Sequence, residues 1–126
     1  MTELRHEKLT YELRGVLFEA HNMLKLGWPE EAYHQAVTHL LEHKGIPVLF
    51  KPRRPVIHRG IEVQLFECDL IAWDTIILEF KMLPFSTFAP AHYAQIIHYL
   101  KCWSKDLGLL VNFGKQQLQI YGVNAD

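Results

Sequence analysis

The stretch that decides the fold spans residues 69–81 and reads DLIAWDTIILEFK. Branched and aromatic residues dominate it, and Asp74 marks a turn between two predicted strands. Side chains alternate between the two faces of a strand, so Glu79 and Lys81 share one face with Ile77. The other face of that strand is wholly apolar. A carboxylate and an ammonium therefore project side by side from a strand that otherwise has the composition of a buried one.

The preceding strand, predicted as residues 61–73, carries a third charge in the same way. Alternation places Asp69 opposite a wholly apolar face, which is formed by Phe66, Cys68, Leu70 and Ala72. If residues 73–75 form a three-residue loop, Asp69 lies directly across from Glu79. The two carboxylates then repel each other unless a cation lies between them. Two hard oxygen ligands beside open water positions suit Mg²⁺ or Mn²⁺.

On either side of Asp69 and Glu79, hydrophobic periodicity and turn signals predict a mixed α/β fold. The predicted helices are residues 9–26, a second one that begins at Pro29 and ends before Gly45, and 90–103. The predicted strands are residues 48–51, 56–59, 61–73, 76–82, 107–112 and 118–123. The order α-α-β-β-β-β-α-β-β indicates a central mixed sheet flanked by helices. No repeat or linker interrupts the pattern, so we expect residues 1–126 to form a single domain.

Composition limits the classes of function without choosing among them. The chain has 13 basic and 14 acidic residues and a net charge of -1, so any nucleic-acid binding must come from a local patch. Its two cysteines form no CxxC pair, and an intracellular, reducing setting is expected. No apolar run approaches the ~20 residues that a membrane span needs. We therefore expect a cytoplasmic protein with no membrane partner.

The predicted helices contribute further polar candidates. Glu30 falls within about 20° of Val37 on the helical wheel, on the apolar stripe of the second helix, whereas Glu31 points elsewhere. A carboxylate on such a stripe needs a partner or a metal. In the third helix, Gln95 and Tyr99 are four residues apart on one edge of the apolar stripe.

Several motifs resemble those of a known family. The segment from Asp69 through Glu79-Phe80-Lys81 resembles the D…(D/E)xK signature of the PD-(D/E)XK nuclease superfamily. Residues 27–33, GWPEEAY, match the GxxExxY motif, which names a family of small bacterial proteins assigned to that superfamily. Residues 95–99, QIIHY, are similar to the QxxxY element of its RecB-like branch, and residues 108–114, GLLVNFG, also look like the family. The resemblance covers roughly residues 10–123.

The resemblance implies a restriction-endonuclease-like core, metal-assisted phosphodiester hydrolysis and DNA as the partner. Asp69 and Glu79 would bind the divalent metal, Mg²⁺ or Mn²⁺, helped by the carbonyl of Phe80. Glu30 would complete the metal shell through water. Lys81 would position and polarise the attacking water and offset charge on the phosphate. Two residues would support them: Gln95 would orient the substrate or the lysine, and Tyr99 would brace it.

Other interpretations of these residues stay open. Asp69, Glu79 and Lys81 are also compatible with a structural salt-bridge cluster, and Glu30 with a helix N-terminus that favours a carboxylate through its dipole. His39 and His43 have ligand spacing for zinc, but the wheel turns His39 toward solvent.

The basic residues Lys51, Arg53, Arg54, His58 and Arg59 form the one local cationic cluster. It either contacts phosphates, as expected for Lys51, Arg53 and Arg54, or forms a charged edge strand that resists aggregation.

Three functional hypotheses follow. The first is a Mg²⁺-dependent DNA nuclease, favoured by the intact Asp69, Glu79 and Lys81. The second is a catalytically silent nuclease-fold protein that binds or regulates, favoured by the near-neutral charge. The third is an unrelated structural protein with a chance ExK. A chain of this size would cover few base pairs, so a homodimer is compatible with the first hypothesis although the sequence reveals no interface.

Overall fold

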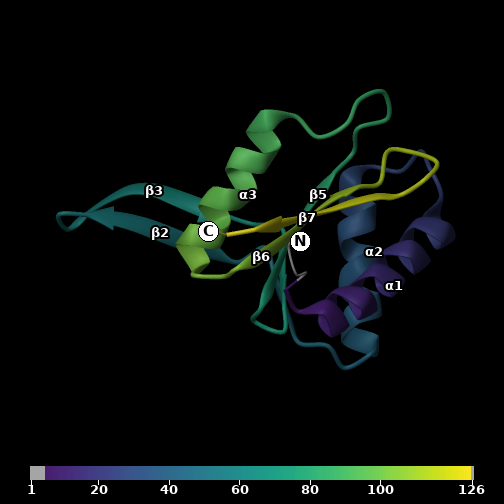
Figure 1. Ribbon diagram of the computed structural model, residues 1–126, viewed down its shortest axis with the longest axis horizontal. Helices are drawn as coiled ribbons and strands as arrows, with labels where there is room; N and C mark the ends of the chain where they lie inside the picture. The colour runs from purple at the N-terminus through teal and green to yellow at the C-terminus, as the bar shows by residue number, and fades with distance from the viewer. Residues whose placement is uncertain (1–4, 126) are drawn as a thin grey trace.

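The computed structural model describes residues 5–125 and has the mixed α/β architecture expected from the sequence (Figure 1). The elements in chain order are α1 (Glu7–Leu24), α2 (Glu30–His43), β1 (Val48–Phe50), β2 (Arg53–His58), β3 (Ile61–Glu67), β4 (Leu70–Ala72), β5 (Ile76–Lys81), α3 (Pro90–Trp103), β6 (Leu107–Asn112) and β7 (Gln119–Asn124). Helices on both faces of a mixed sheet give the restriction-endonuclease-like arrangement. None of the helices in residues 5–125 is both long and apolar enough to cross a membrane.

The main sheet has five strands in the order β1-β4-β5-β6-β7. Strands β5 and β6 are parallel, and the remaining neighbours are antiparallel. Parallel neighbours need a crossover connection, and α3 supplies it between β5 and β6. Strand β5, which carries Glu79 and Lys81, is therefore the centre of the sheet and has a helix-covered face on either side.

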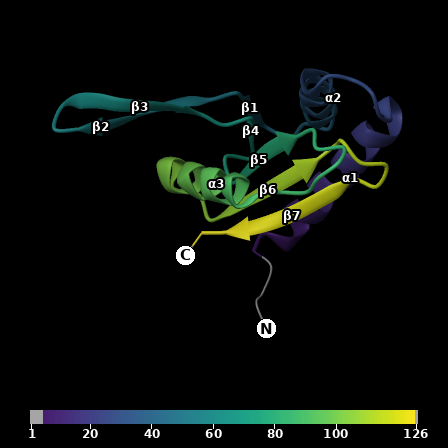
Figure 2. The same ribbon diagram turned by 90° about the horizontal axis from the view of Figure 1, so that it is seen from above.

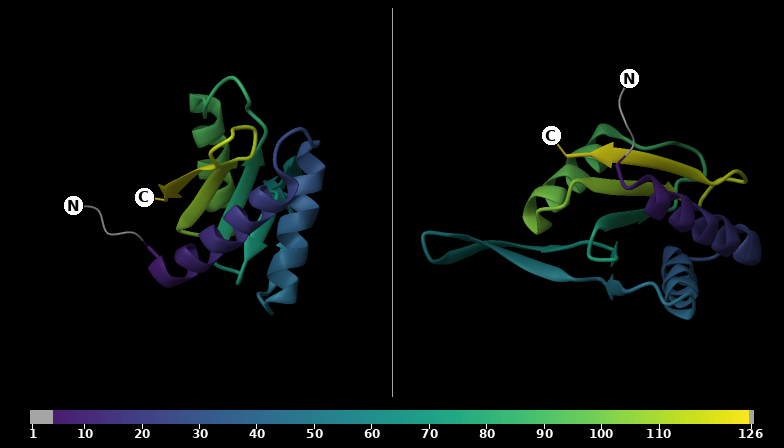
Figure 3. Two further views of the ribbon diagram at one scale, coloured as in Figure 1. Left: turned by 90° about the vertical axis from the view of Figure 1, so that its right-hand side faces the viewer. Right: turned by 60° about the horizontal axis from the view of Figure 1, so that its bottom comes forward.

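Two hydrophobic cores lie on the two faces of the sheet. Helices α1 and α2 lie side by side over one face (Figure 3) and bury Leu78 and Phe80 of β5. In that core Tyr33 stacks on Phe113, and its hydroxyl donates a hydrogen bond to the carbonyl of Lys25 at the end of α1. Tyr33, the last residue of the GxxExxY match, therefore joins the two helices to the sheet.

Helix α3 covers the other face of the sheet. It packs Ile96 and Leu100 against Ile77 of β5. Gly108 in β6 permits this close approach, because an added Cβ there would lie 2.6 Å from the Cδ1 atom of Ile96.

The ends of α3 agree with the sequence prediction of residues 90–103. Pro90 occupies the first helical turn, where a missing N–H costs nothing. The N–H of Ala89 donates to Nδ1 of His92 at 2.9 Å, so this histidine caps the start of the helix. The helix ends where Ser104 adopts a φ of 54°. Helix α1, in contrast, ends at Leu24, two residues earlier than predicted, because Lys25 leaves the helical conformation.

The predicted strand over residues 61–73 is wrong, since the chain changes sheets within it. Strand β3 pairs with β2 in a separate two-stranded sheet, and β4 pairs with β1 and β5 in the main sheet. The segment that pairs with these residues, 48–58, bends at Lys51, whose φ is 50°. Pro52, which follows, has no N–H to continue the hydrogen-bond ladder between the strands.

The predicted common face of Phe66, Cys68, Leu70 and Ala72 is wrong for the same reason. Phe66 and Cys68 pack on the α3 side of the sheet, whereas Leu70 and Ala72 pack on the α1–α2 side. The side-chain alternation is therefore interrupted between Cys68 and Leu70, at the position of Asp69.

The β2–β3 hairpin projects from the body of the molecule alongside α3 (Figure 2). Its turn is Arg59-Gly60, as the sequence predicts, with φ values of 51° and 77°. Such a pair of positive φ values suits the twist of a two-residue hairpin. Strand β2 is longer than the predicted 56–59 and includes Pro55, which a two-stranded ribbon tolerates because its outer edge is unpaired.

Candidate functional site

Strand parity aims Glu79 and Lys81 at the face of the sheet that α3 covers. Their neighbour Ile77 packs there, whereas Ile76, Leu78 and Phe80 enter the opposite core. Because β4 and β6 flank β5, Glu79 is only 3% exposed. The site is thus built on a buried central strand, where a carboxylate costs free energy unless other groups compensate it.

Asp69 lies directly across from Glu79 and exchanges hydrogen bonds with its strand. Leu70 is opposite Leu78 in the β4–β5 register, which makes Asp69 and Glu79 the next pair. The N–H of Asp69 donates to Oε1 of Glu79 at 2.8 Å, and the N–H of Phe80 donates to Oδ2 of Asp69 at 2.7 Å. This reciprocal pairing fixes both carboxylates at the point where the chain passes from the hairpin into the main sheet.

The environment disfavours two negative charges at this point. Burial, followed by repulsion from Asp69, raises the pKa of Glu79 to about 9. Burial also raises the pKa of Asp69, although the nearby His34 and the Phe80 N–H oppose that shift. At neutral pH the pair therefore holds a proton unless another positive charge takes its place.

Helix α3 holds the ammonium of Lys81 through a short relay. Nζ of Lys81 donates to Oε1 of Gln95 at 3.1 Å, and Nε2 of Gln95 donates to the hydroxyl of Tyr99 at 3.1 Å. Burial, then the charges of Glu79 and Asp69, raise the pKa of Tyr99 to about 12, so its hydroxyl stays neutral. The family resemblance implied that Gln95 orients the substrate or the lysine, and the i,i+4 spacing on α3 brings Gln95 and Tyr99 together beside Lys81.

Helix α2 approaches the carboxylates from the other side through a residue that the sequence reasoning missed. Nε2 of His34 lies 3.6 Å from Oδ2 of Asp69 and 3.6 Å from Oε2 of Glu30. The His34 side chain is 4% exposed, and within residues 5–125 neither ring nitrogen has a hydrogen-bond partner. The signal was present in the sequence, since His34 follows Glu30 by four residues and so shares its helix face.

Glu30 itself is less enclosed than its wheel position suggested. Its side chain is 44% exposed at the first turn of α2, and it faces Asp69 across His34. The negative charge of Glu30 is one of the groups that raise the pKa of Asp69. Glu30 therefore contributes to the electrostatic environment of Asp69 and Glu79.

Glu31 points away from the apolar stripe of α2, and its 51% exposed side chain has charged neighbours. Its Oε2 lies 2.7 Å from Nζ of Lys51 and 4.0 Å from Nδ1 of His34. This ion pair lowers the pKa of Glu31. Glu31 therefore lies between His34 and Lys51, a basic residue of the expected phosphate contact.

The basic cluster is partly neutralised in the same way. Lys51 is paired with Glu31, and Nε of Arg53 lies 2.9 Å from Oε2 of Glu67. Arg54 is exposed and has no carboxylate within ion-pair distance in the part of the chain that the structure describes. Of the three residues expected to contact phosphate, only Arg54 has an uncompensated charge.

The residues around Asp69 suit a divalent cation, although they do not yet enclose one. The carboxylates offer hard oxygen ligands, burial raises the pKa of both so that a nearby positive charge would be favourable, and the ring nitrogens of His34 are unpartnered. Within residues 5–125 no group of three or more His, Cys, Asp or Glu side chains already converges as a metal site. His39 and His43 are exposed on α2.

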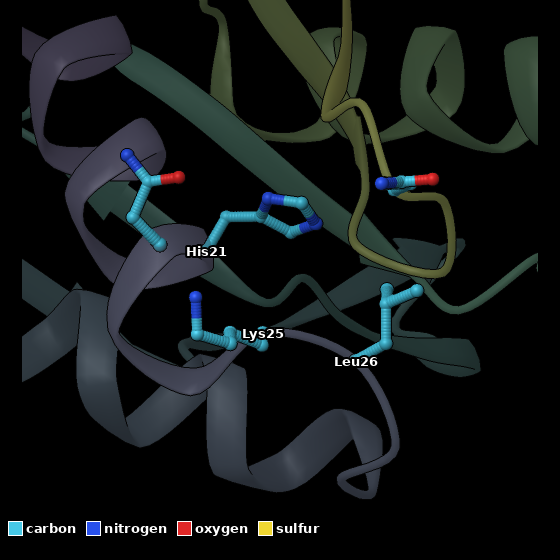
Figure 4. Close-up of a pocket in the computed structure, with 5 residues that line it drawn as sticks. His21, Lys25 and Leu26 are labelled. Carbon is cyan, nitrogen blue, oxygen red and sulfur yellow. The ribbon is translucent and has the colours of Figure 1, made fainter.

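A separate pocket at the C-terminal end of α1 carries none of this chemistry (Figure 4). Its lining consists of His21, Asn22, Lys25, Leu26 and Gln116. No carboxylate lines it, and Nε2 of His21 is already 2.8 Å from the carbonyl oxygen of Lys115. We therefore place the candidate site at Asp69 and Glu79.

Comparison with known proteins agrees with this architecture. A family model described as the PD-(D/E)XK nuclease superfamily matches residues 7–122. A solved structure described as "Crystal structure of SSO0001" is similar in fold, with a TM-score of 0.57 and 19% identity over 75% of this chain and 49% of that chain. The present chain thus spans about half the length of that structure. A search of curated proteins found no match.

Proposed function

Because the chain belongs to the PD-(D/E)XK nuclease superfamily, we propose that it is a metal-dependent nuclease that hydrolyses phosphodiester bonds in DNA. The observation that carries the proposal is the reciprocal pairing of Asp69 with Glu79, with Lys81 on the same face of the same strand. We also assign the chain to the GxxExxY family within that superfamily, because Gly27, Glu30 and Tyr33 occupy the positions of that motif.

The proposed cofactor is Mg²⁺ or Mn²⁺, held by Asp69 and Glu79 with the carbonyl of Phe80 and, through water, Glu30. A bound ion of this kind supplies Lewis-acid polarisation of the phosphate and a template for the reacting groups. The two carboxylates support this assignment, because they lose a shared proton more readily when a cation replaces it. His34 borders the same point, with Nε2 3.6 Å from Oδ2 of Asp69.

Lys81 has the catalytic role that remains. Its ammonium positions and polarises the attacking water and offsets the charge that develops on the phosphate. Gln95 accepts a hydrogen bond from that ammonium and so fixes its direction, while the neutral hydroxyl of Tyr99 braces the Gln95 amide. The roles are thereby divided, because the carboxylates hold the ion whereas the lysine acts on water and phosphate.

The proposed contacts to the DNA backbone are unequal. Arg54 is free to contact phosphate, whereas Lys51 and Arg53 reach phosphate only by exchanging their carboxylate partners. That exchange releases Glu31 and Glu67 to water and costs little at an exposed site. Backbone contacts of this kind position a substrate without reading its sequence.

A catalytically silent binding or regulatory protein is the second candidate. The observation that favours it is the charge balance: the net charge is -1, and two of the three expected phosphate contacts are already paired. Such a protein would bind its partner through the same face without turnover.

The test compares Lys81→Ala, Glu79→Ala and the wild-type protein on supercoiled plasmid, single-stranded DNA and branched DNA in Mg²⁺ and in Mn²⁺. Lys81→Ala should lower the cleavage rate by ~10²–10³-fold, by analogy with lost oxyanion donors, and keep Mn²⁺ binding in calorimetry. Glu79→Ala should lose both cleavage and Mn²⁺ binding. Lys44→Ala, an exposed lysine that follows α2, is the control. Cleavage that survives Lys81→Ala contradicts the assignment, and an inactive, metal-loaded wild type favours the binding protein.

A further inference from the structure

A groove runs between the β2–β3 hairpin and α3, outside the carboxylate pair. Two adjoining cavities of about 530 Å³ and 390 Å³ form it, and they share Gln64, Phe66 and His98 as lining residues. Each volume lies within the range of roughly 300–1,000 Å³ that small-ligand sites have. The hairpin lines the groove with Val56 and residues 64–67, and α3 lines it with residues between Ala91 and Cys102.

One end of the groove opens onto the candidate active site. Gln95 and Tyr99 line that end, and Gln95 accepts the hydrogen bond from Lys81. A bound polymer that lies in the groove therefore reaches the proposed catalytic lysine without leaving the protein surface.

The floor of the groove presents aromatic surface. Phe66 is half-buried, and Tyr99 holds its ring by an edge-to-face contact with centroids 5.8 Å apart. His98 is exposed on α3 and lines both cavities. Aromatic side chains arranged along a groove are the usual platforms on which unpaired bases stack.

The far end of the groove is cationic. Arg54 is paired in register with Phe66, so its side chain leaves the hairpin on the face that lines the groove. Lys101 lines the same end from α3. Neither has a carboxylate within ion-pair distance among residues 5–125, so both charges are available to a phosphate backbone.

From the aromatic floor, the cationic end and the opening toward Lys81, we propose that this groove binds a single-stranded segment of nucleic acid and feeds it to the active site. The proposal rests on the proposed nuclease function and names its substrate class. Base faces are available for stacking on Phe66 and His98 only when the strand is unpaired. In a duplex the bases are already paired and stacked on one another, so their faces are not offered to these side chains.

The experiment measures binding separately from cleavage. Fluorescence anisotropy of a short labelled oligothymidylate, and of its duplex with oligodeoxyadenylate, is recorded in EDTA so that no cleavage occurs. We expect the single strand to bind at least ~10-fold more tightly than the duplex. His98→Ala and Phe66→Leu should each weaken single-strand binding, by roughly 5- to 150-fold for a lost base stack. Lys101→Ala should also reduce the dependence of the binding constant on salt concentration.

Phe18→Leu on α1 is the matched control, because Phe18 is a partly exposed aromatic residue outside the groove. His98 is exposed, so His98→Ala keeps the test valid if Phe66→Leu fails to fold. Equal affinity for single strand and duplex, wild-type affinity in His98→Ala, or no binding of either oligonucleotide overturns the proposal; the last result would leave the groove to a protein partner. Single-strand binding without cleavage by any metal-loaded protein would instead contradict only the nuclease function.

Discussion

Strands β5 and β6 pair with each other in the main sheet, and strands β2 and β3, of similar length, pair with each other in the hairpin. The two pairs differ in how far their side chains are buried. Every residue of β5 and β6 is buried except the half-buried Lys81. In the hairpin only Val56 and Phe66 are even half-buried. Both pairs are rich in branched residues, so apolar composition alone does not decide burial.

The difference lies in what covers each pair. Helices α1 and α2 cover one face of the β5–β6 pair and α3 covers the other, whereas the hairpin lies beside α3 along one face only. A pair enclosed on both faces holds its side chains in fixed places, as the positions of Glu79 and Lys81 require. An open ribbon offers a surface on which a second molecule can lie. Under the proposed function, chemistry and substrate contact are divided between the two pairs.

The largest expected effect comes from a leucine-to-alanine substitution in each of the two strand pairs. Leu78→Ala in β5 removes a side chain that is 0% exposed and should lower the free energy of unfolding by about 2–5 kcal/mol. Leu65→Ala in β3 removes one that is 50% exposed and should cost under about 1 kcal/mol. Urea unfolding followed by circular dichroism measures both. Equal losses would mean that another molecule covers the hairpin in solution, which a dependence on protein concentration would reveal.

A second test uses the buried acid of β5. Because the pKa of Glu79 is raised to about 9 in the folded protein from 4.5, the folded state binds a proton that the unfolded state releases. The metal-free protein should therefore lose stability as the pH rises from about 5 to 9, by at most about 1.4 kcal/mol per pH unit for one proton. Urea unfolding in EDTA at several pH values measures the slope.

Two glutamine variants identify the source of that slope. Glu79→Gln should flatten the profile, whereas Glu62→Gln on the exposed strand β3 should leave it unchanged, because that carboxylate lies in water. A wild-type slope retained in Glu79→Gln would assign the pH dependence to other groups.

The smallest expected effect concerns the ion pair at the base of the hairpin. Arg53 and Glu67 have side chains 67% and 39% exposed, so their interaction is screened by water. A double-mutant cycle with alanine at both positions should give a coupling of about 0.2–1 kcal/mol that disappears in high salt. Coupling well above this range would show that the hairpin is more rigid than its exposure implies.

Local signals were enough to predict a large part of the fold. The bounds of α3 and β6 match the predicted residues 90–103 and 107–112, because Pro90 fixes the start of the helix and β6 is a continuous apolar run. The opposition of Asp69 and Glu79 was also predictable, because a short turn at Asp74 leaves one register between neighbouring antiparallel strands.

Predictions that depended on distant partners were less accurate. Alternation was applied across residues 61–73, and it failed at Asp69 because the partner strand bends at Lys51 and Pro52, which no period within 61–73 records. The ion pair of Glu31 was not predicted because Lys51, its partner, lies twenty residues further along the chain. His34 was missed because, although it follows Glu30 by four residues, its approach to Asp69 joins two distant parts of the chain.

The sequence by itself determined which side chains share a face of β5 and which helices are amphipathic, because backbone geometry repeats with fixed periods within one element. It thereby placed Asp69, Glu79 and Lys81 in one neighbourhood and Gln95 and Tyr99 on one helix edge. Only the tertiary structure decided how deeply Glu79 is buried, which basic side chains are neutralised and that a groove separates the hairpin from α3. Burial and pairing depend on elements brought together from distant parts of the chain, and a local period specifies a face without specifying what covers it.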